Sequence, residues 1–272
     1  MTDRFGTRLA TVVAERGPLC IGIDPHAPLL AAWGLGDDAA GARELGLRVV
    51  EAAAGRVGIV KPQIAFFERH GSAGYAALEE VLAAARAAGL LVIADVKRGD
   101  VGSTVDAYGE AWLTPGSPLE ADAMTAVAYQ GFGSLDGVIA RAAGAGKGVF
   151  VLAATSNPES AEVQARLGLT GTTLASDMVR HAAAHDGDVG VVVGATVSLT
   201  ELGIDPRSLA DVPVLAPGFG AQGARLTDAP ALFGPAISRV LPNVARSILE
   251  AGADGIVDAI DGARAEVASW RR

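Results

Sequence analysis

Short apolar runs rich in β-branched residues recur along the chain, and Ala-rich stretches with helical spacing lie between them. The pattern predicts eight strands, at residues 19–24, 58–63, 91–97, 121–126, 148–154, 189–195, 212–216 and 237–241. It predicts helices at 39–54, 74–88, 105–112, 135–143, 161–167, 173–184 and 243–270, the last with a break near Gly252. Strands that alternate with helices in this way form a parallel sheet.

Eight such units in 272 residues are typical of a closed (β/α)8 barrel, the TIM-barrel fold of the α/β class. No low-complexity linker or shift in composition divides the chain, so a single domain over residues 1–272 is expected. The segments 25–37, 114–120 and 221–235 are predicted as irregular loops, and the last is a candidate lid. Active sites of barrels lie at the C-terminal ends of the strands, so the chemistry is expected there.

Hydrophobic residues make up 50% of the chain, enough to bury a large core, and the mean hydropathy is +0.34. A net charge of −9 argues against a nucleic-acid binder and against attachment to an anionic membrane. The single cysteine, Cys20, excludes an internal disulfide and fits a reducing compartment, so a cytoplasmic location is expected. The first residues lack the apolar core of a signal peptide, and no apolar run approaches the ~20 residues of a membrane span.

The third predicted strand ends in charge, with Asp95, Lys97 and Asp100 in the spacing Asp-x-Lys-x-x-Asp. Because side chains alternate along a strand, Asp95 and Lys97 share a face with Ile93. Lys61 ends the neighbouring strand, so an alternating array of lysines and carboxylates is expected at the barrel mouth. An ammonium between carboxylates is a tuned proton donor. The alternative is an ordinary ion-pair network at a strand end.

Glycines follow the seventh predicted strand in the segment 217–223, where Gly218 begins a Gly-x-Gly-x-x-Gly pattern. Glycine lets backbone N–H groups turn toward an anion, and the loops after strands seven and eight of a barrel are its usual phosphate site. Arg246 follows the eighth strand and can add a charged contact. Phosphate is therefore the expected ligand. A dinucleotide is not, because no Asp or Glu lies between residues 229 and 249 to hold a ribose.

A metal site is not expected. His181 and His185 have the i, i+4 spacing of a chelating pair, but such pairs more often lie on a solvated helix face. No Cys/His cluster accompanies them, and the acids at the strand ends are already paired with lysines.

The segment 94–104, Ala-Asp-Val-Lys-Arg-Gly-Asp-Val-Gly-Ser-Thr, resembles the signature of the orotidine 5'-phosphate decarboxylase family, in its longer bacterial subgroup (type 2). Further matching segments occur in the same order along the chain, at 19–25, 60–63, 154–158, 191–196, 217–223 and 245–247. The resemblance implies a cofactor-free decarboxylation of orotidine 5'-phosphate to uridine 5'-phosphate, the last step of de novo pyrimidine nucleotide synthesis.

The resemblance also implies roles for the charged residues. Lys97 would protonate C6 of the pyrimidine as CO2 leaves. Asp95 would crowd the departing carboxylate and orient the lysines, and Lys61 would complete the array. Asp100 and Thr104 would act across the interface of a homodimer, in the active site of the partner.

The contacts implied for the rest of the substrate come from other strand ends. Asp24 would bind the ribose and Ser156 the pyrimidine edge. Gln222 and Arg246 would bind the phosphate, beside the loop that begins at Gly218.

Three other functions stay open at this point. A magnesium-dependent sugar-phosphate decarboxylase or synthase shares the Asp-x-Lys-x-x-Asp pattern, but Lys61 and the lack of spare acids count against it. A catalytically silent nucleotide-binding protein is the second possibility. The lysine and carboxylate array counts against it, because binding alone does not need a carboxylate aimed at an anionic substrate. A Schiff-base aldolase would use Lys97 as its nucleophile. Turnover in the presence of a chelator and borohydride trapping separate these possibilities from a cofactor-free decarboxylase.

Overall fold

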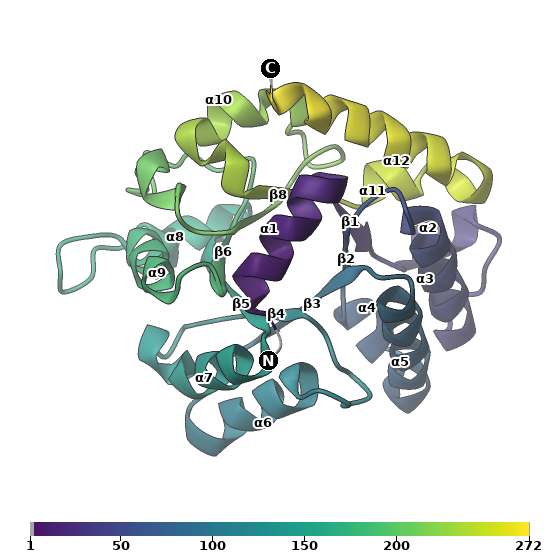
Figure 1. The fold of residues 1–272 in the computed structure, drawn as a ribbon, viewed down its shortest axis with the longest axis horizontal. Coiled ribbons are helices and arrows are strands. Elements are labelled where there is room, and N and C mark those ends of the chain that lie inside the picture. The colour runs from purple at the N-terminus through teal and green to yellow at the C-terminus, as the bar shows by residue number, and fades with distance from the viewer. Residues whose placement is uncertain (1–2, 272) are drawn as a thin grey trace.

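A computed structural model of the chain describes residues 3–271, and its centre is a closed barrel of eight parallel strands. The strands pair in sequence order, from β1 with β2 round to β8 with β1. Figure 1 shows the strands as a ring with helices around it. The (β/α)8 barrel predicted from the alternation of strands and helices is therefore confirmed.

The strands are β1 (Cys20–Ile23), β2 (Ile59–Pro62), β3 (Leu91–Arg98), β4 (Ala123–Ala126), β5 (Gly148–Ala154), β6 (Val189–Val193), β7 (Val214–Pro217) and β8 (Val240–Val244). The α-helices are α1 (Phe5–Arg16), α2 (Ala27–Ala32), α3 (Ala39–Ala53), α4 (Ala65–Glu68), α5 (Gly71–Ala87), α6 (Gly102–Leu113), α7 (Asp136–Ala145), α8 (Ala161–Gln164), α9 (Leu174–Ala182), α10 (Ala229–Phe233), α11 (Arg246–Leu249) and α12 (Gly252–Ala268). Short 3-10 helices are η1 (Phe132–Leu135), η2 (Pro158–Ser160), η3 (Ala183–His185), η4 (Pro206–Leu209), η5 (Leu226–Asp228), η6 (Gly234–Arg239) and η7 (Ser269–Arg271).

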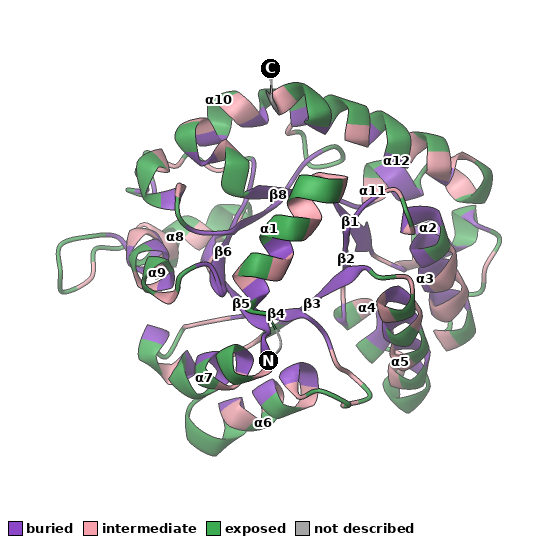
Figure 2. Ribbon diagram, in the orientation of Figure 1, coloured by how far each residue is buried: buried purple, intermediate pink, exposed green. Residues whose placement is uncertain are grey.

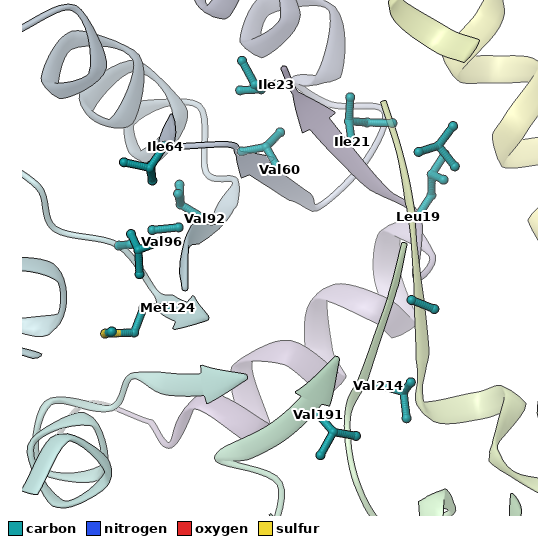
Figure 3. Close-up of a cluster of buried hydrophobic side chains, with 14 of the residues drawn as sticks. Leu19, Ile21, Ile23, Val60, Ile64, Val92, Val96, Met124, Val191 and Val214 are labelled. Atoms are coloured by element: carbon teal, nitrogen blue, oxygen red, sulfur yellow. The ribbon is translucent and has the colours of Figure 1, made fainter. Parts of the chain in front are cut away.

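Two layers of apolar side chains hold the barrel together. Alternate residues of the strands fill its interior, among them Ile59, Ile93 and Leu215. The opposite strand faces pack against the helices, and Figure 3 shows part of this outer cluster, including Val60 and Val191. In Figure 2 the strands are buried and the surrounding helices are buried on the side that faces them. The interior of the barrel is therefore a packed core.

Helix α1 covers one end of the barrel, where Figure 1 shows it lying across the ring. Phe5 belongs to the interior cluster, and its ring stands edge-on to that of Phe150, with 6.0 Å between the centroids. A Cβ on Gly148, the first residue of β5, would lie 2.3 Å from the Phe5 ring, so the glycine makes room for the helix. The hydrophobic pattern does not predict α1. The opposite end of the barrel, at the C-terminal ends of the strands, stays open.

Three segments differ from the prediction. Strand β8 lies at Val240–Val244 instead of 237–241, because it continues through Pro242 and because η6 precedes it. The segment 25–37, predicted as a loop, contains α2, and 221–235 contains α10. Prolines in the first turn begin both helices, although proline is also a signal for loops. No helix within residues 3–271 is long and apolar enough to cross a membrane.

Candidate active site

A pocket of about 600 Å³ opens at the C-terminal ends of the strands. Leu152, Val192 and Leu215 supply its apolar part, and they belong to or pack against the barrel interior. The remaining wall is polar and includes Asp95 and Lys97 from β3. The pocket therefore stands on the packed core, with charge concentrated on one side.

The centre of the charged side is the carboxylate of Asp95, which holds two ammonium groups. Lys61 Nζ lies 2.7 Å from Asp95 Oδ2, and Lys97 Nζ lies 2.5 Å from Asp95 Oδ1. Gln63 Oε1 lies 3.5 Å from both ammonium nitrogens. Two of the three lysines of the chain therefore meet on one carboxylate.

The two lysines differ in exposure. The side chain of Lys61 is 5% exposed, whereas that of Lys97 is 41% exposed and faces the pocket. The Lys61 ammonium is therefore committed to the protein interior, and the Lys97 ammonium is available to a ligand.

Charge and burial compete in this centre. Burial alone would raise the pKa of Asp95, but the ammonium groups of Lys61 and Lys97 outweigh it and lower the pKa to about 2. Burial alone would lower the pKa of Lys61, but the carboxylates of Asp95 and Asp24 outweigh it and raise the pKa to about 12. Asp95 and Lys61 are consequently both charged near neutral pH, because their pairing outweighs the cost of burying the two charges.

Asp24 follows β1 on the adjacent wall of the pocket. Burial raises the pKa of its carboxyl, and the nearby Lys61 ammonium opposes this only in part. Its Oδ1 atom is buried and has no hydrogen-bond partner among the described residues. A buried acceptor without a partner fits a ligand hydroxyl group.

The far wall is formed by the ends of β5, β7 and β8. Ser156 Oγ donates a hydrogen bond to Gln222 Oε1 at 3.2 Å, which links the loops after β5 and β7 across the pocket. Gly218 and Gly220 have φ angles of +114° and +76°, a region that favours glycine. The Arg246 side chain lines the pocket and has no ion-pair partner within residues 3–271. A free guanidinium beside a glycine loop fits an anion.

Two residues singled out by the sequence lie outside the pocket of this chain. Asp100 accepts a hydrogen bond from the backbone N–H of Val101, and Thr104 is exposed in the first turn of α6. Neither contacts the lysines. The structure thus brings together Lys61, Asp95 and Lys97, and it leaves Asp100, the second acid of the Asp-x-Lys-x-x-Asp pattern, outside the pocket of its own chain.

Sequence reasoning missed two other polar residues of the site. Thr125 Oγ1, on β4, donates a hydrogen bond to Asp95 Oδ1 at 2.9 Å. Asn243, on β8, lines the pocket and accepts a hydrogen bond from the Cys20 thiol at 3.6 Å. A polar residue that breaks an apolar run, as both do, is the signal that could have found them.

The histidine pair takes part in packing. The rings of His181 and His185 stack on that of Phe132, with centroid distances of 4.8 and 6.1 Å. No cluster of three or more acidic, histidine or cysteine side chains suited to a metal occurs among the described residues.

Fold and pocket together define a (β/α)8-barrel protein with a lysine–aspartate–lysine centre at the C-terminal ends of its strands. A sequence model of the orotidine 5'-phosphate decarboxylase / HUMPS family matches residues 17–257, and the chain belongs to this family.

Individual relatives cover nearly the whole chain. A Streptomyces coelicolor protein named orotidine 5'-phosphate decarboxylase is 50% identical over 261 residues, which are 93% of this chain and 92% of the relative. A protein of the same name from Nocardioides sp. is 53% identical over 254 residues, 90% of this chain and 91% of the relative. A crystal structure from Streptomyces avermitilis, provisionally assigned as the same enzyme, aligns with a TM-score of 0.94 at 47% identity and covers 99% of this chain and 96% of that one.

Proposed function

We propose that this chain decarboxylates orotidine 5'-phosphate to uridine 5'-phosphate and CO2, the last step of de novo pyrimidine nucleotide synthesis. Relatives that share about half of its sequence over nearly its full length carry the name of this enzyme. Within the site, the proposal is carried by one observation: the Asp95 carboxylate binds both the Lys61 and the Lys97 ammonium groups at the base of the pocket.

Lys97 is the proton donor in this proposal. The bond between C6 and the carboxylate carbon breaks, CO2 leaves, and the electron pair stays on C6 and takes a proton from the Lys97 ammonium. A fixed positive charge beside C6 stabilises the developing negative charge more than it stabilises the substrate, and this difference accelerates the reaction. Lys97 suits this role better than Lys61, because its side chain is 41% exposed, whereas that of Lys61 lines the same pocket but is only 5% exposed.

The remaining walls suit the remaining parts of the substrate. Asp24, with its unpartnered Oδ1, would accept a hydrogen bond from a ribose hydroxyl. Ser156 would bind the edge of the pyrimidine. Gln222, Arg246 and the glycine loop at Gly218 would bind the phosphate, where backbone N–H groups and a guanidinium favour a dianion.

We also propose a homodimer with shared active sites, in which Asp100 and Thr104 of one copy reach the pocket of the other. Two apolar side chains are exposed in the same part of the chain: Val101, next to Asp100 in the sequence, is 54% exposed, and Tyr129, which follows the neighbouring strand β4, is 81% exposed. Exposed apolar residues next to a pair of polar residues with no role in their own pocket fit a surface between two copies.

A cytoplasmic location belongs to the same proposal. Cys20 is the only cysteine of the chain and is a buried free thiol, which fits a reducing compartment. Fractionation of cells that produce the protein tests this location.

The activity is tested by following the loss of orotidine 5'-phosphate absorbance with purified protein and no added metal. We expect turnover that a chelator does not reduce, and Lys97→Ala should abolish it while uridine 5'-phosphate still binds. Lys147→Ala is the matched control, because Lys147 is the third lysine and pairs with Glu120 far from the pocket. It should lower thermal stability and leave kcat unchanged. Absence of turnover in the wild-type protein would refute the function.

Shared active sites are tested by mixing two inactive variants, Lys97→Ala and Asp100→Asn, under conditions that exchange subunits. A mixed dimer contains one site with both native residues only if each site takes Lys97 from one copy and Asp100 from the other. Recovery of activity on mixing is therefore expected, and a mixture that stays inactive while light scattering shows exchanged dimers contradicts the proposal.

A further inference from the structure

The backbone of β3 is irregular where it carries the catalytic lysine. The register between β3 and β4 shifts between Ala94 and Arg98, so that strand β3 bulges opposite Thr125. Lys97 lies in this bulge with a φ of +48°, a left-handed conformation that is uncommon for a residue other than glycine. Bulges next to active sites re-aim a side chain, and a strained residue persists only where its surroundings hold it.

Thr125 holds both parts of this arrangement. Its Oγ1 accepts a hydrogen bond from the backbone N–H of Lys97 at 2.9 Å and donates one to Asp95 Oδ1, also at 2.9 Å. The hydroxyl thus replaces a ladder partner that the bulge removes from Lys97. The Thr125 side chain is almost fully buried, with the residue 1% exposed, so water does not compete for these bonds.

We propose that Thr125 is a positioning residue that aims the Lys97 ammonium at the reacting carbon. The inference rests on the proposed decarboxylase function and adds to it a residue that does not touch the substrate, since Thr125 does not line the pocket. One hydroxyl fixes the backbone from which the lysine projects and the carboxylate to which its ammonium is bound.

The Lys97 side chain has few other restraints. Its ammonium contacts Asp95 Oδ1 at 2.5 Å and, more weakly, Gln63 Oε1 at 3.5 Å within the described part of the chain. Lys61 restrains the other oxygen of Asp95, at 2.7 Å, whereas Thr125 Oγ1 bonds both to Asp95 and to the backbone N–H of Lys97. Without the Thr125 hydroxyl, the N–H of Lys97 loses its partner and Asp95 can rotate, so the ammonium leaves the geometry that proton transfer needs.

The test compares Thr125→Val, which keeps the shape and removes the hydroxyl, with Thr125→Ser, which keeps the hydroxyl. Thr125→Val should lower kcat roughly 10- to 100-fold, the range expected for the loss of a hydrogen bond to a charged group. The KM and the affinity for uridine 5'-phosphate should change less than about threefold. Thr125→Ser should restore kcat to within about threefold of the wild type.

Thr173→Val is the matched control, because Thr173 is also buried. Its Oγ1 likewise accepts a hydrogen bond from the backbone N–H of Ser176 and donates one to the carbonyl oxygen of Leu202. It lies outside the pocket and should lower thermal stability without lowering kcat. A loss of kcat in Thr125→Val alone, with rescue by serine, supports the positioning role.

Several results overturn the inference. Folded Thr125→Val with wild-type kcat does so, and so does an equal loss of kcat in Thr173→Val or a failure of serine to rescue. If Thr125→Val does not fold, Thr125→Ala carries the same expectation. Inactivity of the wild-type protein would instead refute the proposed function, so the two failures are distinguishable.

Discussion

Replacing Asp95 with asparagine tests the charge balance of the site most directly, because it removes one charge and almost no volume. In the native protein the Lys61 ammonium, 5% exposed, is balanced chiefly by Asp95 and secondarily by Asp24. Asp95→Asn leaves that ammonium buried with a weaker partner. Lys97 is 41% exposed, so water screens its charge and it adds little to the loss.

The expected loss of stability follows from the burial of Lys61. Breaking a buried ion pair by removal of one partner costs about 3–5 kcal/mol. The amide oxygen of asparagine still accepts one hydrogen bond and Asp24 remains, so the low end applies, about 3 kcal/mol. For a chain of this size class the Tm should fall by about 6–12 °C. The kcat should fall at least about 100-fold, as when a preorganised electrostatic group is lost.

The pH dependence of the stability loss gives the sharpest readout. In the wild type the pKa of Lys61 is raised from 10.5 to about 12, so its stabilising contribution is complete below 10.5 and is lost as the pH rises through 12. In Asp95→Asn burial outweighs the remaining carboxylate, and the pKa of Lys61 falls below 10.5. The folded variant then releases a proton before the unfolded chain does, so its stability rises with pH in that range.

The difference in Tm between wild type and Asp95→Asn should therefore be largest near pH 7 and shrink toward pH 10, measured by calorimetry. The double variant Asp95→Asn/Lys61→Met should regain part of the lost Tm, because it removes the unpaired ammonium. Glu80→Gln, which breaks an exposed ion pair with Arg43, is the control and should change the Tm by less than about 3 °C. If Asp95→Asn had the same Tm as the wild type, or if the difference in Tm between them widened as the pH rises, the Lys61 ammonium would not be stabilised by the Asp95 carboxylate.

Three further predictions concern the pocket wall for which we propose phosphate binding, and the barrel interior. Arg246→Ala should lower kcat/KM for orotidine 5'-phosphate roughly 10- to 100-fold. The kcat/KM for orotidine, which lacks the phosphate, should stay nearly unchanged. Equal losses for both substrates would contradict phosphate binding. Gly220→Ala should raise the KM and lower the Tm, because the φ of Gly220 is +76° and the added Cβ would lie 2.3 Å from Ser247 Oγ. Gly262→Ala is the control. Its added Cβ has open space around it, so neither the KM nor the Tm should change. Burial raises the pKa of the Cys20 thiol to about 12. A thiol reagent at pH 8 should therefore label the protein only after unfolding. Rapid labelling of the native protein would show that Cys20 is at the surface instead.

The sequence predicts those parts of the fold that depend on local patterning. Strand β5 is predicted at 148–154 and lies at Gly148–Ala154, because an apolar run bounded by turn residues is a sufficient signal for a buried strand. Helix α1 is different. Only a few of its residues are buried, and Phe5 and Leu9 are buried because the end of a barrel built from the rest of the chain is there to receive them. No local pattern contains that information.

In the charged centre, too, some features are predictable from the local sequence and others depend on the rest of the fold. Lysine and aspartate within an apolar strand are expensive to bury, so Asp95 and Lys97 stand out in the sequence, and the contact between them that alternation suggested is present. Regular strand alternation does not produce this contact, however, because Lys97 lies in a β-bulge and has a left-handed backbone conformation. Threonine is common in strands, so Thr125, 28 residues away, does not stand out in the same way. Residues that carry charge are therefore recognisable from sequence, whereas the positioning role that we propose for the neutral Thr125 follows only from the placement of β3 beside β4.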